Sequence, residues 1–377
     1  MQRIHAPRTV LAATGAAVLA LLVLAGLGTS VQAQGLANSG AVFTMTNAAN
    51  GNAVLAFQRL ANGRLHFLNS FPTNGDGAGA GLGNQGGVVL SEDGRNLFAV
   101  NAGSDSLSVF AVGPGGLTLV DVEPSGGSEP ISVTNSGDLV YVLNRGGDGN
   151  IAGFELATDG TLSAISGSVR PLSESAPDPA QIAFSPDGRA LVVTEKGTNR
   201  LVTYQVGQDG LPSDPIVNPS EGVTPFGFSF GHRNRLFVSE AFGGAADAST
   251  VSSYDLAADG SLIPITSALP TTETAACWLV ITGNGRYAYT TNTGSGSVSG
   301  LHIARDGAVS LLDADGVTGQ AGNTPIDAAL SRNSRFLYVL NSTDHSLSAF
   351  AVGADGSLTP LPGVSGLPAG TNGLAAL

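Results

Sequence analysis

The chain has 377 residues, of which 53 are glycine and one, Cys277, is cysteine. Twenty-nine acidic residues outnumber 16 basic ones, and the net charge of −13 argues against a nucleic-acid partner, because binding a polyanion needs a basic patch. A single cysteine excludes an intramolecular disulfide framework and any cysteine-based zinc site. With 42% apolar and 12% charged residues, the chain is expected to fold around a large core of short strands and tight turns.

The first 33 residues have the pattern of a secretory signal peptide. Arg3 and Arg8 form a basic start, an uncharged apolar run covers residues 10–28, and Val31 and Ala33 supply the small residues of a cleavage site. An uncleaved anchor is the alternative, because a run of this length just suffices to cross a bilayer. We predict cleavage after Ala33, Sec-type export to a secreted, periplasmic or envelope location, and no stable membrane span afterwards. Loss of the two arginines takes the net charge from −13 to −15.

A turn-forming residue followed by glycine recurs along the rest of the chain. The glycines of these pairs are Gly63, Gly116, Gly160, Gly210, Gly260, Gly307 and Gly356. Seven copies between residues 63 and 356 give a mean period of about 49 residues. Such pairs favour tight hairpins, because Asp-Gly and Asn-Gly readily adopt the positive φ that these turns require.

Each repeat also contains an apolar run that ends in asparagine or glutamate. These runs end at Asn47, Asn101, Asn144, Glu195, Glu240, Asn292 and Asn341. A short apolar run such as 182–185 precedes them, and an alternating segment such as 347–352 follows. We therefore predict four strands per repeat, named a, b, c and d in chain order. Four strands in roughly 45 to 50 residues, seven times over, predict an all-β, seven-bladed β-propeller across residues 34–377.

The two ends of the repeat region complement each other. The first repeat has no strand a, whereas residues 373–377 resemble a strand a with nothing after it. We predict that this C-terminal strand joins the N-terminal blade and closes the ring, which removes two exposed sheet edges. An open solenoid is the alternative, but it needs capping repeats that the sequence lacks.

Strands that run alternately up and down sort the connections onto two faces. The a–b and c–d turns share one face, called here the turn face, and the b–c and d–a loops share the other, called the loop face. The loop face surrounds the mouth of the central channel, and there the repeats differ. Glu195 and Glu240 replace asparagine at the end of strand b, while Arg145 and Lys196 follow it in two repeats.

These differences define the candidate site. We expect Glu195, Glu240 and Arg145 to be catalytic, because a buried carboxylate with a raised pKa can transfer protons and a cation can polarise an oxygenated substrate. The expected substrate-binding residues are Lys196, Arg200, Asn144, Asn292, Asn341 and His345. The d–a loops bring three further carboxylates, Glu129, Asp178 and Glu273, toward the same mouth. Alternatively, the asparagines and glutamates only cap the b–c turns through backbone hydrogen bonds.

No cofactor is required by this pattern and no residue has metal-ligand spacing, although Ca²⁺ held by mouth carboxylates is a variant worth testing. Two glycine motifs are interpreted as structural. Residues 227–231 (Gly-Phe-Ser-Phe-Gly) match a nucleophile elbow but lie in a predicted strand a with no helix after it. Residues 81–86 (Gly-Leu-Gly-Asn-Gln-Gly) match a dinucleotide fingerprint but lead into a strand, so they are predicted to connect two blades.

The repeats resemble those of the seven-bladed β-propeller lactonase family, which includes 6-phosphogluconolactonases and 3-carboxy-cis,cis-muconate cyclases. The similarity lies in three segments: Ser-Pro-Asp-Gly-Arg-Ala-Leu-Val-Val at 185–193, Leu-Tyr-Val-Leu-Asn at 337–341, and residues 347–358. Similar motifs also occur in YVTN-type propellers. The resemblance implies that lactone rings are opened or closed at the channel mouth by His, Glu and Arg side chains. It also implies that Arg145 is the anion-binding arginine and that Glu195 or Glu240 is the family's glutamate.

Two functions follow as alternatives. The first is an exported hydrolase of a small sugar- or muconolactone-like lactone, with the oxyanion stabilised by Arg145 or Lys196. The second is a non-catalytic secreted propeller that binds a protein, a glycan or a small ligand at the mouth. In either case we expect a monomer.

Overall fold

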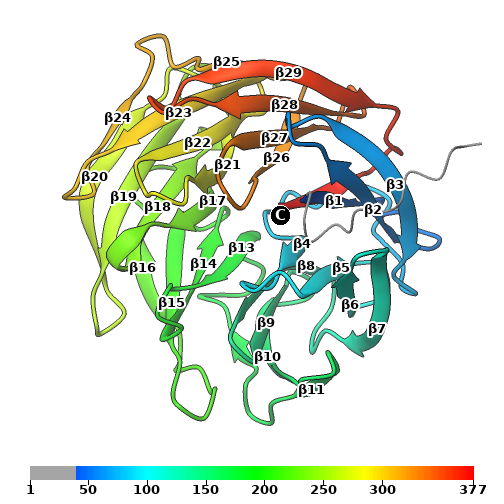
Figure 1. The fold of residues 1–377 in the computed structure, drawn as a ribbon. Coiled ribbons are helices and arrows are strands. Elements are labelled where there is room, and N and C mark those ends of the chain that lie inside the picture. Colours follow the sequence, from blue (N-terminus) through cyan, green and yellow to red (C-terminus); the bar gives the residue numbers. More distant parts are fainter. Residues whose placement is uncertain (1–39) are drawn as a thin grey trace, which may run out of the picture. The chain divides into compact units, whose positions relative to one another are not determined.

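The computed structural model describes residues 40–377, which form seven antiparallel sheets around a common axis (Figure 1). The predicted all-β, seven-bladed propeller is confirmed. The predicted signal peptide, residues 1–33, lies outside the described residues. Within residues 40–377 no helix has the length and apolar character needed to cross a bilayer.

Strands a and b form the inner half of each blade. From blade 1 to blade 7, the a strands are β30 (Asn372–Ala376), β4 (Val88–Leu90), β8 (Pro130–Ser136), β13 (Pro179–Phe184), β17 (Pro225–Phe230), β21 (Ala276–Ile281) and β26 (Pro325–Leu330). The b strands are β1 (Ala41–Met45), β5 (Asn96–Asn101), β9 (Leu139–Asn144), β14 (Ala190–Glu195), β18 (Arg235–Glu240), β22 (Tyr287–Asn292) and β27 (Phe336–Asn341).

Strands c and d form the outer half. The c strands are β2 (Ala53–Arg59), β6 (Ser106–Gly113), β10 (Asn150–Leu156), β15 (Arg200–Gln205), β19 (Thr250–Leu256), β23 (Ser297–Ile303) and β28 (Ser346–Val352). The d strands are β3 (Leu65–Pro72), β7 (Gly116–Pro124), β11 (Leu162–Ala164) with β12 (Arg170–Pro171), β16 (Ile216–Pro219), β20 (Leu262–Pro270), β24 (Val309–Leu311) with β25 (Gly319–Gln320), and β29 (Leu358–Ser365). Strand d is thus interrupted in blades 3 and 6. Blade 5 adds two 3-10 turns, η1 (His232–Asn234) and η2 (Phe242–Gly244).

The predicted closure is confirmed. Strand β30 pairs antiparallel with β1, so the inner strand of blade 1 comes from the C-terminal end of the chain. Leu374 and Ala375 of this strand are buried, and the Thr44 hydroxyl donates to the Asn372 carbonyl at 3.3 Å. The closure therefore uses both packing and strand pairing.

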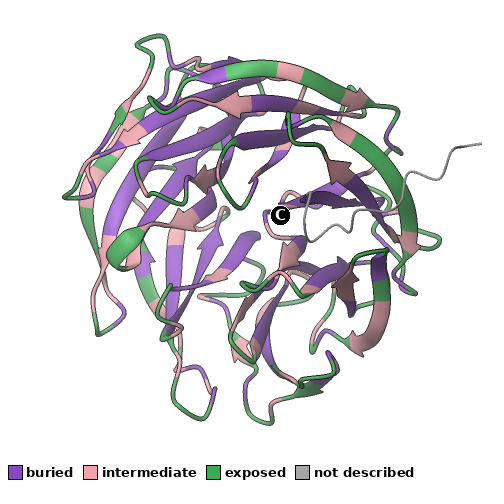
Figure 2. Cartoon of the chain, viewed as in Figure 1, coloured by how far each residue is buried: buried purple, intermediate pink, exposed green. Residues whose placement is uncertain are grey.

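The core lies between neighbouring sheets, where apolar side chains of strands b and c are buried, while most residues of the d strands are partly or fully exposed (Figure 2). Tyrosines of strand b link consecutive blades across this core. The hydroxyls of Tyr289 and Tyr338 each donate at 2.8 Å to a glycine carbonyl in the c–d turn of the next blade, Gly356 and Gly63 respectively. The second bond joins blade 7 to blade 1, so the tyrosine hydrogen bond that links consecutive blades is also present where the ring closes.

Candidate active site

One hydrogen bond is repeated around the loop face. In blades 3 to 7 the amide that follows strand b donates to the carbonyl of the residue that precedes strand a, at 2.9 to 3.0 Å. All five carbonyl-bearing residues have positive φ; they are Glu129, Asp178, Thr224, Ala275 and Thr324. Because the strained backbone recurs in every one of these blades, it belongs to the repeat. Only the side chains at these positions distinguish one blade from another.

Those side chains are charged in two neighbouring blades only. Blade 3 places Glu129 beside Arg145, and blade 4 places Asp178 beside Lys196; we call these four residues the charged sector. The corresponding pairs in blades 5 to 7 are uncharged. Arg145 donates from Nη2 to the Glu129 carboxylate, and Lys196 Nζ lies 3.3 Å from the Asp178 carboxylate. The sector is thus built from two ion pairs that differ from the rest of the ring.

Lys196 is the most enclosed member of the sector. Its side chain is 10% exposed, and its ammonium lies 4.9 Å from the centre of the Phe226 ring, which in turn packs against Trp278. Burial lowers the pKa of Lys196, and the neighbouring Asp178 carboxylate partly offsets this effect. Cys277 is also buried here, and burial raises the pKa of its thiol to about 11, so it is not a ready nucleophile.

The glycine-rich residues 81–86, called here the channel segment, lie across the ring at this face. Arg145 Nη1 donates to the Leu82 carbonyl at 2.6 Å, and Lys196 Nζ donates to the Gly83 carbonyl at 2.7 Å. Trp278 Nε1 donates to the Asn84 carbonyl at 2.6 Å. The prediction that these residues connect two blades is correct, but their contacts with blades 3, 4 and 6 show that they also fill the channel mouth.

Gln85 fixes the far end of the channel segment. Its side-chain amide donates to the Leu279 carbonyl at 3.1 Å and accepts from the Leu279 amide at 3.2 Å, while its backbone amide donates to Ala180 in blade 4. Gly227 makes room for it, because a Cβ at Gly227 would lie 2.1 Å from Gln85 Oε1. The Gly-Phe-Ser-Phe-Gly motif is therefore a strand, as expected, whose first glycine accommodates the channel segment.

We expect Gly227→Ala to lower the free energy of unfolding by about 1–3 kcal/mol, because the added methyl group displaces Gln85 or shifts strand β17. Urea denaturation of the variant measures this loss. Gly115→Ala is the matched control, since no atom lies within 4 Å of a Cβ at that position, and its midpoint should stay unchanged. Equal midpoints for both variants would contradict the proposed close approach.

The structure places the two predicted catalytic glutamates inside the blades. Glu195 and Glu240 have no solvent exposure, and neither forms an ion pair with Arg145 or Lys196. Glu195 accepts from the Ser173 amide at 2.9 Å and from the Thr198 hydroxyl at 2.7 Å. These partners lie in the d–a and b–c loops, so Glu195 joins two loops of its own blade.

The buried carboxylate of Glu240 has fewer hydrogen-bond partners than that of Glu195. One carboxylate oxygen accepts from the Thr250 hydroxyl, and the other has no hydrogen-bond partner within the described part of the chain. Burial raises the pKa of Glu240 to about 7, and the neighbouring hydroxyls of Ser252 and Thr250 and the Gly222 amide only partly offset this effect. The predicted raised pKa is therefore present, but on a side chain that does not face the mouth.

The other predicted binding residues are also dispersed. Arg200 donates to Ser173 at 3.0 Å and to Glu174 at 2.8 Å, and His345 is an exposed loop residue of blade 7. Asn144, Asn292 and Asn341 are fully buried and donate mainly to side chains at the start of strand c. The residues at the end of strand b thus bond mainly to side chains and to the d–a loops, and their catalytic or binding role stays a prediction.

Within residues 40–377 no group of three or more His, Cys, Asp or Glu side chains is placed to hold a metal ion. The calcium variant therefore stays a prediction, to be tested with a chelator. Of the carboxylates expected at the mouth, Glu129 and Asp178 join the charged sector, whereas Glu273 is buried and accepts from the Ser297 hydroxyl. The signal for the first two was their position directly before the proline of strand a, next to a basic residue in the following loop.

The fold and this mouth define a closed seven-bladed propeller with one charged sector on its loop face. The family model described as "Lactonase, 7-bladed beta-propeller" matches residues 38–171. This match agrees with the resemblance that the repeats indicated.

Curated relatives and solved structures are also similar to this chain. A 6-phosphogluconolactonase of Serratia proteamaculans (strain 568) is 25% identical over 275 residues, which cover 71% of this chain and 80% of the relative. The structure of a periplasmic gluconolactonase of Pseudomonas aeruginosa is 17% identical with a TM-score of 0.69 and covers 89% of this chain and 99% of its own. A putative 6-phosphogluconolactonase of Bacteroides fragilis NCTC 9343 is 18% identical, with a TM-score of 0.66 over 90% of this chain and 98% of its own. At these identities the structural likenesses establish the fold alone.

Proposed function

We propose that the protein hydrolyses a small lactone at the charged sector. The observation that carries the proposal is that Arg145 and Lys196, with their carboxylates, are confined to two adjacent blades at the channel mouth of a propeller that matches the lactonase family model over residues 38–171. The match to the lactonase family model supports a lactone hydrolase role, and the relative from Serratia proteamaculans is a 6-phosphogluconolactonase.

Hydrolysis needs a base for water and a cation for the developing oxyanion. Asp178 has a side chain that is 55% exposed, so in this proposal it accepts a proton from the attacking water. The water oxygen bonds to the lactone carbonyl carbon, and N–H groups of Arg145 and Lys196 that are not used by Leu82 and Gly83 stabilise the oxyanion. The ring C–O bond then breaks, the ring oxygen takes a proton, and a hydroxy acid leaves. Glu195 and Glu240 act in this scheme only by holding the loops.

The substrate we propose is a neutral sugar or aromatic lactone. A phosphorylated or polycarboxylate lactone would approach a chain with a net charge of −13, which disfavours a further anion. The site requires no cofactor in this scheme.

The test is hydrolysis of a lactone panel by the purified protein, with and without chelator. The panel runs from gluconolactone and its 6-phosphate to simple γ- and δ-lactones, and acid release is followed by pH-stat. We expect turnover that Asp178→Asn abolishes, while Glu92→Gln on the turn face leaves it unchanged. A requirement for a divalent cation would add calcium to the mouth. No turnover above background on any lactone would refute the proposal.

One observation favours the second function, a non-catalytic binding propeller. Arg145 and Lys196 are both engaged by carbonyls of the channel segment and by carboxylates, and the segment fills the mouth. If the lactone panel is inactive, the same face is the surface to use in searching for a protein, glycan or small ligand.

Export is likewise proposed, on the sequence pattern of residues 1–33 alone. N-terminal sequencing of the protein recovered from cell fractions checks it: a mature chain that begins at Gln34 in an extracytoplasmic fraction is expected, and an intact cytoplasmic chain would contradict it.

A further inference from the structure

The turn face, opposite the proposed lactone site, has a basic groove between blades 5 and 6. This groove has a volume of about 450 Å³ and is lined by one histidine and four arginines, together with apolar and turn residues. The basic residues are His232, Arg233, Arg235, Arg286 and Arg305. Four arginines gathered in one groove are unusual in a chain that has only 16 basic residues and a net charge of −13.

Most of this positive charge is not neutralised. Arg235 lies 2.9 Å from the Asp255 carboxylate and also donates to the Arg305 carbonyl. The side chains of Arg233 and Arg305 form no hydrogen bond or ion pair with residues 40–377, and Arg286 contacts only the Tyr287 ring, at 5.4 Å. Among the described residues, three guanidinium groups of the groove, those of Arg233, Arg286 and Arg305, therefore have no counter-ion.

The a–b turn of blade 6 shows how the charge is left free. In blades 2 and 4 this turn contains aspartate, and Asp93 Oδ1 accepts from Ser91 at 2.7 Å and from the Arg95 amide at 2.9 Å. In blade 6 Asn284 Oδ1 accepts the equivalent bonds at 2.8 and 3.0 Å. The turn needs only one oxygen, so an amide serves as well as a carboxylate. The asparagine therefore removes a negative charge beside Arg286 without loss of turn structure.

Contacts between the blades shape the groove. Gly285 has a φ of +65°, and a Cβ there would lie 2.2 Å from the His232 ring, so the turn of blade 6 fits closely against the turn of blade 5. Arg233 has a φ of +64°, a left-handed conformation for which it makes no compensating side-chain contact.

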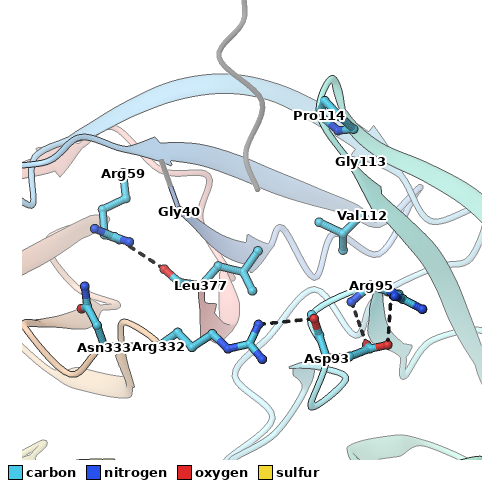
Figure 3. Close-up of a pocket in the computed structure, with 11 residues that line it drawn as sticks. Gly40, Arg59, Asp93, Arg95, Val112, Gly113, Pro114, Arg332, Asn333 and Leu377 are labelled. Carbon is cyan, nitrogen blue, oxygen red and sulfur yellow. Dashed lines mark hydrogen bonds and ion pairs between the residues drawn. The ribbon is translucent and has the colours of Figure 1, made fainter. Parts of the chain in front are cut away.

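The cavity in Figure 3 is a useful contrast on the same face. It is lined by Arg59, Arg95 and Arg332, but each of these is already engaged. Arg59 donates to the Leu377 carbonyl, Arg332 to the carbonyls of Glu92 and Asp93, and Arg95 lies 3.6 Å from the Asp93 carboxylate. Those arginines tie the turns together, whereas the arginines between blades 5 and 6 do not.

We propose that the groove between blades 5 and 6 binds a compact ligand with two or more oxyanion groups, such as phosphates, sulfates or carboxylates. Guanidinium groups pair with such groups through two parallel hydrogen bonds, and several unpaired arginines in one groove favour a multiply charged ligand over a single anion. A volume of about 450 Å³ suits a small molecule. The proposal is independent of lactone hydrolysis, because the two sites lie on opposite faces.

Isothermal titration calorimetry of the full protein at constant ionic strength tests this site, with pyrophosphate, citrate and ethanedisulfonate as separate probes. We expect at least one probe to bind with a Kd below about 1 mM. The probe that binds most tightly identifies the oxyanion class. No binding of any of the three would overturn the proposal.

Two variants locate the binding. Arg233→Ala/Arg286→Ala should raise the Kd at least about tenfold, and Asn284→Asp should raise it several-fold while both arginines remain, because it restores the missing carboxylate. Arg189→Ala is the control, an exposed arginine in the aspartate-containing turn of blade 4, and should leave the Kd unchanged. Equal weakening by the control and by the double variant would mean that net charge alone governs binding, and would also overturn the proposal.

Discussion

Arg145→Ala is expected to lower kcat for the best lactone of the panel by about 100- to 1000-fold, the usual effect of removing one oxyanion donor. The guanidinium lies at the channel mouth, is 25% exposed, and uses one nitrogen for Leu82 and another for Glu129, which leaves N–H groups for a substrate oxygen. Steady-state kinetics give kcat and KM separately. A fall in kcat with little change in KM is the signature of a contact formed in the transition state.

Arg145 also holds the channel segment, so a structural effect must be separated from a chemical one. Arg145→Lys keeps the positive charge and should recover at least about tenfold of the lost kcat. Arg64→Ala, on the turn face, is the charge-matched control and should retain full activity. If Arg145→Ala and Arg145→Lys both keep kcat within threefold of the native protein, Arg145 has no role in the reaction.

Glu240→Gln is expected to stabilise the protein above pH 7. The pKa of Glu240 is raised from its ordinary 4.5 to about 7 by burial, so the unfolded chain loses this proton before the folded one does. The stability that the protonated group contributes is complete below pH 4.5 and is lost as the pH rises to about 7. This pKa difference corresponds to about 3 kcal/mol, and at pH 8 the ionised carboxylate lowers the free energy of unfolding by this full amount relative to low pH. Glutamine has no such dependence.

Urea denaturation of both proteins at pH values from 4.5 to 8 measures the effect. The difference in unfolding free energy should be near its minimum at pH 4.5 and should grow by up to about 3 kcal/mol in favour of Glu240→Gln by pH 8. Asp327 is buried and its pKa is also raised by desolvation, so the difference between the two proteins is the quantity to follow. Glu92→Gln, an exposed turn variant, should show a constant difference. A constant difference for Glu240→Gln would contradict the raised pKa.

The blades could be predicted from the sequence because each is a local structure. Turn pairs such as Asp-Gly and Asn-Gly, and the alternation of apolar residues in strands, depend on only a few neighbouring residues. The missing first strand a is found by counting strands. The same pattern also occurs seven times along the chain, which makes it easy to recognise. The strand d interruptions in blades 3 and 6 were not predicted, since nothing in the turn pattern marks where an outer strand bends away from its neighbour.

The candidate site was predicted only in part. Arg145 and Lys196 were recognised because the first residue after strand b is charged in these two repeats and uncharged in the others. The side-chain direction of Glu195 and Glu240 was not accessible, because position at a strand end does not say whether a carboxylate turns to the mouth or into its own blade. The channel segment was predicted as a connection between blades, but its contacts across the ring were not, because the partners are remote: Trp278 and Leu279 lie 194 residues from Asn84 and Gln85. No local pattern encodes contacts over that distance.

The pairing of β30 with β1 has a consequence for how the ring is assembled. Six blades are built from contiguous residues and can form as soon as those residues are present. Blade 1 cannot, because its inner strand lies some 330 residues from its neighbour, as the 328-residue separation of Thr44 and Asn372 shows. Contacts of such separation form late, since the chain must first lose the entropy of closing a very long loop. Folding of the intervening repeats brings the two ends together, so we expect docking of β30 to be a late step, before which the edge of β1 is unpaired.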